Sequence, residues 1–294
     1  MTIHTLTTDF ILARQADGRA PRTISDYHRT LNNFTHWFTR HAQALDRDTI
    51  RRYVASLYAS DWSLGTVGIY VRNLRAFLHW LHLEGKTQEN LARAVKAPKP
   101  ATRIENLPTD RELLDLIHTC QDDRQALRDR ALILTFLDTG LRIGELVKMQ
   151  RADLHFDPDL TWFQIHATKN DVIHLAFLGQ VTTCALLQYL DTRDDALPAL
   201  WTGLRGPLTP TGIYKALRRR ALQADLDPRR VHPHAFRKLF ATLWTENGGD
   251  RTRLKCLGGW RSDAMLDRYV LLAGRAKLAA GHHRYAPVDH LLRQ

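Results

Sequence analysis

Three short motifs are the most informative part of this sequence: TGLRIGEL at residues 139–146, HAFR at 234–237, and LGGW at 257–260 with Tyr269 nine residues after its tryptophan. The TG pair is typical of a helix end, and it places Arg142 in a tight turn between helices. The proline before HAFR is typical of a helix start, so His234 and Arg237 share one helix three residues apart. The GG pair before Trp260 favours a loop end over a helix interior.

The side chains of these motifs suit the cleavage of a phosphodiester without a metal. Such a reaction needs positive charge on the non-bridging oxygens, and Arg142 and Arg237 supply permanent, bidentate charge. The Trp260 indole donates one hydrogen bond and accepts none, so at a phosphate it stabilises oxygen. A phenol such as Tyr269 is a poor nucleophile at neutral pH and needs a proton acceptor, for which His234 is suited.

Each of these residues also has an ordinary structural interpretation. Arg142 and Glu145 have the spacing of a surface ion pair on a helix. His234 also suits a cap on a core helix. Trp260 and Tyr269 both suit core packing, the tyrosine because Leu266 and Val270 lie at helical spacing around it. The conjunction of residue types in one order, rather than any single residue, favours the chemical interpretation.

In this conjunction the chain resembles the tyrosine recombinases, the phage-integrase family that includes the Xer-type recombinases. The resemblance implies that Tyr269 attacks phosphorus, forms a 3′-phosphotyrosyl link and frees a 5′ hydroxyl. It also implies that Lys169, in a turn between two strands, donates a proton to the departing 5′ oxygen, although a solvated turn lysine is the commoner case. One position departs from the family pattern, because Lys238 stands where a second histidine is usual. The implied catalytic residues are Arg142, Lys169, His234, Arg237, Trp260 and Tyr269.

Composition agrees with a polyanionic partner. The 294 residues carry a net charge of +11, and 44% of them are hydrophobic, enough for two folded domains. The three cysteines are widely spaced, without zinc or disulfide patterns, which favours free thiols in a reducing cytoplasm. A signal peptide, a membrane span, a Walker loop and a dinucleotide motif are all missing. We therefore expect a cytoplasmic protein that is nucleoid-associated when bound to DNA. We expect neither a cofactor nor a metal, because the candidate metal ligands His232, His234, His282 and His283 lack further ligands nearby.

The periodicity predicts a mainly α protein with a small β-sheet in two domains. Residues 1–97 have the apolar stripes of about four helices and resemble the family's core-binding domain. Residues 98–107, with two prolines, predict an extended linker. Residues 108–294 resemble the catalytic domain with a C-terminal tail; Thr109 is a predicted N-cap, and strands are predicted at 161–166 and 172–177. The bundle begins almost at Met1, so the arm-binding domain of some phage integrases is expected to be absent.

Basic residues outside the catalytic set suggest contacts with the DNA backbone, although charge runs are usually only solvated surfaces. The two domains would clamp duplex DNA from opposite sides. The predicted DNA-binding residues are Arg51, Arg72, Arg75, Arg218, Arg219, Arg220 and Arg229.

The resemblance implies site-specific integration, excision or dimer resolution by four protomers on two synapsed duplexes. The protein would act alone or with a second recombinase or an accessory factor. We hypothesise that the short amphipathic stretch at 288–292 docks into a neighbouring protomer. Two alternatives use the same fold: a nicking-closing enzyme like the type IB topoisomerases, and a DNA-binding protein without catalysis. The sequence does not reveal the target site.

Overall fold

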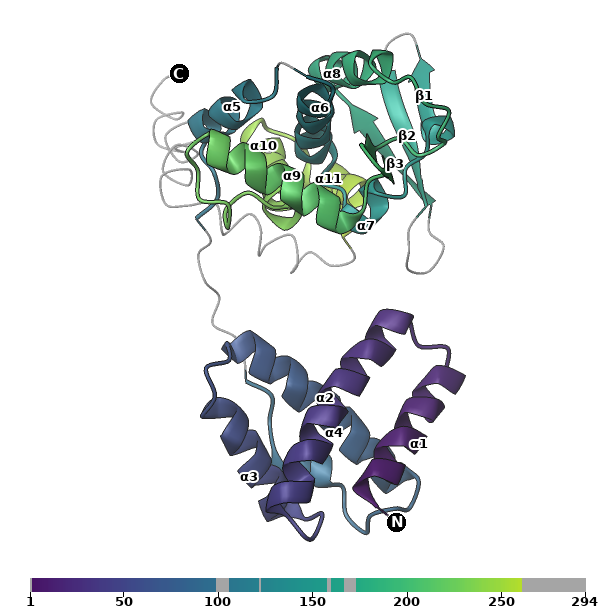
Figure 1. The fold of residues 1–294 in the computed structure, drawn as a ribbon, viewed down its shortest axis with the longest axis vertical. Coiled ribbons are helices and arrows are strands. Elements are labelled where there is room, and N and C mark those ends of the chain that lie inside the picture. The colour runs from purple at the N-terminus through teal and green to yellow at the C-terminus, as the bar shows by residue number, and fades with distance from the viewer. Residues whose placement is uncertain (1, 99–105, 122, 158–159, 167–172, 261–294) are drawn as a thin grey trace, which may run out of the picture. The chain divides into compact units, whose positions relative to one another are not determined.

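The computed structural model describes residues 2–98, 106–121, 123–157, 160–166 and 173–260 (Figure 1). The chain divides into two compact units, Met1–Arg103 and Ile104–Gln294. Within the described residues both units are mainly helical, and the C-terminal unit contains a small sheet. The predicted fold class is therefore confirmed.

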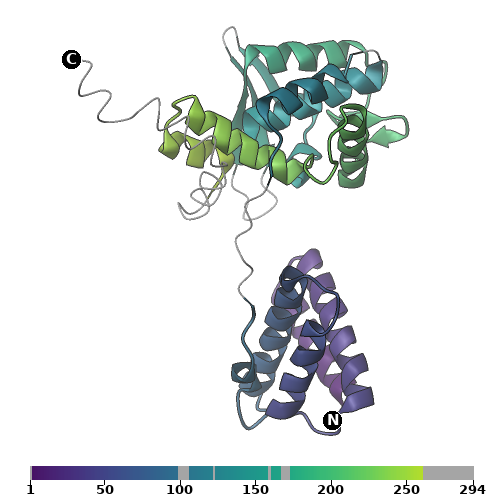
Figure 2. The ribbon, with the colours of Figure 1, turned by 90° about the vertical axis from the view of Figure 1, so that its left-hand side faces the viewer.

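The N-terminal unit is a helical bundle, seen from a second side in Figure 2. Phe77 packs against Phe10 and Phe34 in T-shaped, edge-to-face contacts in its core. Helix α1 packs on α2 and α4, and α3 packs on the same two helices. Asp46 caps α3 by accepting a hydrogen bond from the Thr49 amide at 2.8 Å, as expected at a helix start. Its helices are α1 (Ile3–Ala16), α2 (Pro21–His41), α3 (Arg47–Tyr58), α4 (Leu64–Leu83) and the short 3₁₀ helix η1 (Leu91–Ala94).

The C-terminal unit starts at α5, where Thr109 is the N-cap, as predicted, and forms a reciprocal capping box with Glu112. Pro210 and Pro233 stand at the first positions of α9 and α10. The helices of this unit are α5 (Asp110–His118), α6 (Arg124–Thr139), α7 (Ile143–Leu146), η2 (Arg151–Asp153), α8 (Gln180–Asp191), α9 (Pro210–Gln223), α10 (Pro233–Glu246) and α11 (Arg251–Gly258).

The main sheet is antiparallel, in the order β1-β2-β3, with Phe163 of β2 opposite Leu154 of β1 and Ala176 of β3. Its strands are β1 (Leu154–Asp157), β2 (Leu160–His166) and β3 (Ile173–Leu178). Two strands of two residues each, β4 (Thr202–Gly203) and β5 (Gly206–Pro207), form a separate antiparallel sheet. The sequence predicted β2 and β3 but not β1. Half of the four β1 residues are exposed, so this strand lacks the alternation by which a half-buried strand is recognised.

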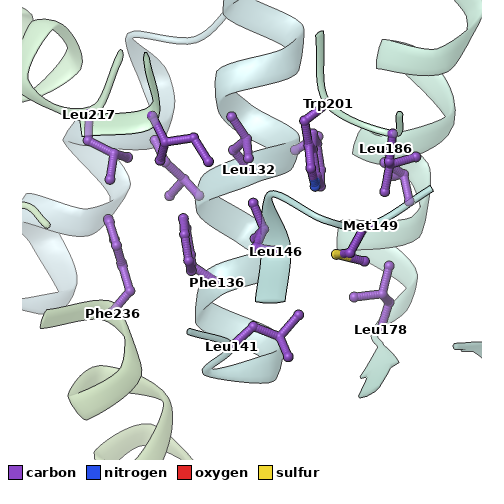
Figure 3. Close-up of a cluster of buried hydrophobic side chains, with 14 of the residues drawn as sticks. Leu132, Phe136, Leu141, Leu146, Met149, Leu178, Leu186, Trp201, Leu217 and Phe236 are labelled. Carbon is purple, nitrogen blue, oxygen red and sulfur yellow. The ribbon is translucent and has the colours of Figure 1, made fainter. Parts of the chain in front are cut away.

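Helix α6 runs through the core of the C-terminal unit, with α8 and β3 packed on one part of it and α10 on another (Figure 3). Phe136 of α6 stacks on Phe236 of α10, with ring centroids 5.8 Å apart and planes 9° from parallel. Both rings are fully buried, which contributes about 1.5–3 kcal/mol for each side chain. This contact fixes the helix that precedes Arg142 against the helix that carries Arg237.

The described residues contain neither a membrane-spanning helix nor a metal-binding cluster. Every helix in that part of the chain is too short or too polar to cross a bilayer. The same residues contain no group of three histidine, cysteine or acidic side chains arranged to hold a metal ion.

Candidate active site

The turn after α6 sets the position of Arg142. Gly140 caps α6 in the left-handed conformation, with φ of 59°, as the TG pair predicts. A Cβ atom on Gly140 would lie 2.4 Å from Cδ1 of Phe240, so glycine also permits the close approach of α10. Two residues later Arg142 becomes the N-cap of α7.

A buried carboxylate fixes Arg142. Its backbone N–H donates to Oε2 of Glu145 at 2.8 Å, and its Nη1 donates to Oε1 at 2.7 Å. The Arg142 side chain is 48% exposed, whereas the Glu145 side chain is 3% exposed. The ion pair considered from the sequence is therefore present, but it is not a surface pair. Glu145 orients a guanidinium that remains accessible to a ligand, a role that its i+3 spacing alone could not reveal.

Arg237 lies on α10 and is buried, with 4% of its surface exposed. Its Nη1 donates to the carbonyl oxygen of Gly140 at 2.5 Å, and its Nη2 donates to the carbonyl oxygen of Gly258. Its Cζ atom lies 4.4 Å from the centroid of the Trp260 ring, in cation–π geometry. The segments around residues 140, 237 and 258–260 therefore meet at one point.

Trp260 follows the end of α11, as the GG pair predicts. Gly259 caps α11 with φ of 60°, and a Cβ atom on Gly258 would lie 2.0 Å from Cζ3 of the indole. The Trp260 ring is 3% exposed and stacks on Phe240, with centroids 6.2 Å apart. Core packing and contact with Arg237 thus occur together, and donation by its indole N–H to a phosphate stays a prediction.

The same turn also receives Arg142, whose Nη2 donates to the carbonyl oxygen of Gly259 at 3.3 Å. Two residues that are 95 positions apart in the sequence, Arg142 and Arg237, are thereby brought to consecutive carbonyl groups of one turn. Two guanidinium groups brought to one turn are suited to an anion with at least two oxygen atoms, such as a phosphate diester.

His234 is exposed in the first turn of α10. The capping role considered for it belongs to His232, whose Nδ1 accepts a hydrogen bond from the Ala235 amide at 3.2 Å. Lys238, which replaces the family's second histidine, is buried on the same helix. Lys169 and Tyr269 lie outside the described residues.

The structure divides the predicted DNA-binding arginines on α9. Arg218 is exposed, and Arg219 is partly exposed while its Nη2 donates to Oδ2 of Asp129 at 2.6 Å. Arg220 is a correction: it is 5% exposed, and its Nε donates to the same oxygen at 2.9 Å. Its Nη1 also donates to the carbonyl of Thr119 at 2.7 Å. Because the buried carboxylate of Asp129 already offsets the charge of this guanidinium, we expect Arg220 to stabilise the fold instead of contacting DNA.

The remaining predicted arginines lie on the surface. Arg51 and Arg229 pair with neighbouring carboxylates, at 3.2 Å from Asp48 and 2.8 Å from Asp227 respectively. Arg72 and Arg75 are exposed on α4. These positions leave contact with DNA as a prediction for each of them.

Comparison with known proteins identifies the family. A profile described as "Phage integrase family" matches residues 108–274, more than half of the chain, and a second profile, "Phage integrase, N-terminal SAM-like domain", matches residues 6–95. The chain belongs to the phage integrase family. The resemblance inferred from the motifs is thereby confirmed, and the family's catalytic domain contains the convergence of Arg142 and Arg237 described above.

Individual members of the family are moderately similar. Tyrosine recombinase XerD of Listeria innocua is 30% identical over 252 residues, which cover 79% of this chain and 82% of that protein. Tyrosine recombinase XerC of Alcanivorax borkumensis is 29% identical and covers 92% of this chain and 89% of its own length.

Two solved structures share the fold. A lambda integrase fragment in a dimer bound to a COC′ core site has a TM-score of 0.76 at 18% identity, covering 94% of this chain and 97% of that one. XerH recombinase bound to a palindromic difH substrate has a TM-score of 0.74 at 18% identity, covering 92% and 81%. At this identity these two structures support the fold alone.

Proposed function

We propose that this protein is a site-specific DNA recombinase, which cleaves and rejoins duplex DNA through a phosphotyrosyl link. The observation that carries the proposal is the convergence of Arg142 and Arg237 on the Gly258–Gly259 turn, within the domain matched by the family profile. The relatives named as tyrosine recombinases, and the recombinases of the same fold solved with DNA, support DNA as the substrate.

In the proposed reaction Arg142 and Arg237 bind the non-bridging oxygens of the scissile phosphate. Charge builds up on these oxygens as phosphorus becomes five-coordinate, so guanidinium groups fixed in advance stabilise the transition state more than the ground state. The buried Glu145 holds Arg142 by two hydrogen bonds, which reduces the cost of ordering that side chain when DNA binds.

The other proposed groups move protons. The Tyr269 phenol oxygen attacks phosphorus, its proton passes to His234, and the bond from phosphorus to the 5′ oxygen breaks. Lys169 gives a proton to that oxygen, so the products are a 3′-phosphotyrosine and a 5′ hydroxyl. The Trp260 indole N–H is proposed as a further donor to the phosphate. Attack by a 5′ hydroxyl on the phosphotyrosine reverses these steps and needs no added energy source.

The assembly is proposed as four protomers on two duplexes, acting at the nucleoid, with a second recombinase or accessory factor as an open possibility. The surface residues Arg51, Arg72, Arg75, Arg218, Arg219 and Arg229 are proposed to contact the backbone of duplex DNA. Sedimentation of the protein with and without cognate duplex would measure the number of protomers in the complex.

Covalent capture tests the proposal. The protein is mixed with a pool of nicked duplexes of random sequence, without metal or ATP, and Tyr269→Phe is the matched control. Because the nick lets the short 5′-hydroxyl strand diffuse away, a 3′-linked complex accumulates and its sequence reports the target site. Capture by the wild type and not by the variant supports the proposal, and strand exchange in the products separates it from a nicking-closing enzyme. Tight, salt-sensitive binding without capture would indicate a DNA-binding protein instead.

A further inference from the structure

Two helices of the C-terminal unit end in the same way. α6 ends at Gly140, with φ of 59°, and α11 ends at Gly259, with φ of 60°. The last carbonyl groups of a helix have no partner within it, and they carry the partial negative charge of the helix dipole. Both ends are therefore suited to receive cations.

The cations they receive are Arg142 and Arg237. The Gly140 carbonyl at the end of α6 accepts from Arg237, and so does the Gly258 carbonyl at the end of α11. The Gly259 carbonyl accepts from Arg142 at 3.3 Å. The end of α11 therefore contacts both arginines, and the end of α6 contacts one of them.

We infer that the diglycine turn, Gly258–Gly259, is a positioning element shared by the two arginines: together with Glu145 at Arg142, it holds both guanidinium groups in place before DNA binds. The inference rests on the proposed function, since it assigns how the phosphate-binding groups are prepared. Two like charges repel one another, and without a ligand the repulsion would separate them. The carbonyl dipoles oppose this separation, and, unlike the carboxylate of Glu145, they add no net negative charge to the site.

The turn can do this only with glycine-like backbone geometry. The φ of Gly259 suits glycine, and asparagine is the next residue that tolerates it, whereas a β-branched residue does not. At Gly258 even one added carbon would overlap the Trp260 ring, which packs beside Arg237. Gly259→Asn should therefore keep the positions of both carbonyls, and Gly259→Val should displace them.

The first test follows the arginine side chains by NMR in the full-length protein without DNA. Lys substitutions at positions 142 and 237 assign the signals. We expect hindered rotation of both guanidinium groups in the wild type and in Gly259→Asn, and faster rotation of Arg142, which keeps its contacts with Glu145 alone, in Gly259→Val. Arg193, whose side chain is wholly buried and bound by Asp195 and by the carbonyls of Ala199 and Leu200, is the internal control for folding. Free rotation of both groups in the wild type would refute the inference.

The second test measures covalent capture at saturating DNA. Gly259→Val should slow formation of the covalent complex about 10²-fold, because misplacing a positioned group by about 1 Å has an effect of that size. The dissociation constant for DNA should stay the same, and Gly259→Asn should react at nearly the wild-type rate. Gly206→Val introduces a similar backbone strain, at φ of 108° with open space around it, and should leave the rate unchanged.

The outcomes separate the inference from the proposed function. An unchanged capture rate in Gly259→Val would overturn the inference while leaving the recombinase proposal intact. Absence of capture by the wild type would overturn the proposed function, and the guanidinium spectra would still decide whether the turn holds the arginines.

Discussion

Two groups of arginines in the C-terminal unit are held by different means. Around Asp129, which is 1% exposed, the side chains of Arg128, Arg219 and Arg220 all donate to one carboxylate, at distances from 2.6 to 3.0 Å. Around the diglycine turn, Arg142 and Arg237 donate to backbone carbonyl groups, and Arg142 also donates to the carboxylate of Glu145.

The two kinds of partner, carboxylate and carbonyl, differ in whether they offset the positive charge of the guanidinium groups. A buried carboxylate offsets the charge of a guanidinium and locks it into the fold, where an unpaired ion would be costly. A carbonyl dipole orients a guanidinium but carries no net charge, so the contact leaves the full positive charge to attract a phosphate. The Asp129 cluster is therefore expected to govern stability and the turn to govern reaction rate.

Replacement of Asp129 tests whether its cluster of arginines governs stability, and we expect it to have a larger effect than the other substitutions. Asp129→Asn removes the charge that three guanidinium groups share, and we expect it to lower the free energy of unfolding by about 3–5 kcal/mol. Urea denaturation followed by circular dichroism measures it. Asp194→Asn is the control, because Asp194 also pairs with an arginine but is 84% exposed, and we expect little change. Equal effects of the two substitutions would contradict the distinction between the clusters.

Replacement of Arg237 tests whether the arginines at the diglycine turn govern the reaction rate. Arg237→Lys keeps one positive charge but loses the planar group that donates to both helix ends and lies over Trp260. We expect the rate of covalent capture to fall about 10²–10³-fold, the size of effect seen when one transition-state donor is lost. Single-turnover capture at saturating DNA measures this rate.

The control for Arg237→Lys is Arg128→Lys, which changes a buried guanidinium of the Asp129 cluster in the same way. That variant should react at nearly the wild-type rate. If both variants slowed the reaction equally, the reactive role could not be assigned to the arginines at the turn.

Local signals in the sequence predicted most of the fold. The TG pair, the proline before HAFR and Thr109 each act through backbone geometry within one turn of a helix, and each predicted boundary is found. The two longer strands of the sheet were also predicted from local sequence, namely from their own runs of residues. The four-residue β1 was missed because its pairing depends on a neighbour rather than on its own pattern.

Tertiary partners explain what the sequence could not supply. Arg218, Arg219 and Arg220 form one charge run, yet only the fold places Asp129 beneath the last two. A signal for Arg220 did exist, because it continues the buried stripe of Ile213 and Leu217 at helical spacing. No comparable signal could show that carbonyl groups hold Arg142 and Arg237, since a carbonyl is present at every residue.

A third prediction concerns an ion pair that lies outside both groups. Arg230 donates to both carboxylate oxygens of Glu112, at 2.6 and 2.7 Å, which joins the start of α5 to the loop before α10. The hydrogen bonds from Arg230 lower the pKa of Glu112 from 4.5 to about 2. Glu112→Gln should lower the free energy of unfolding at neutral pH by about 1–2 kcal/mol, less than Asp129→Asn, because the pair is only partly buried.

The sign of its pH dependence follows from the direction of the shift. A carboxyl group whose pKa is lower in the folded protein stabilises the fold above its unfolded pKa, and that contribution disappears as the pH falls from about 4.5 towards about 2. The wild type should thus lose more of its Tm than Glu112→Gln between pH 6 and pH 3. Parallel decreases in the two proteins would mean that other carboxyl groups account for the acid sensitivity.

Substitutions of the exposed Arg218 and the buried Arg220 on α9 should have smaller effects, and they should differ in kind. If Arg218 contacts a phosphate, Arg218→Gln should weaken binding to all duplexes by a few-fold and reduce the slope of log K against log salt by about 1, without changing the Tm. Arg220→Gln should give the opposite result, a lower Tm with an unchanged salt slope, because its charge is directed at Asp129 and at the carbonyl of Thr119. Binding titrations at several salt concentrations, paired with thermal melts, measure both quantities in each variant. A change in salt slope for Arg220→Gln in a fully folded protein would place that arginine at the DNA after all, and it would show that a carboxylate contact does not exclude a guanidinium from binding phosphate.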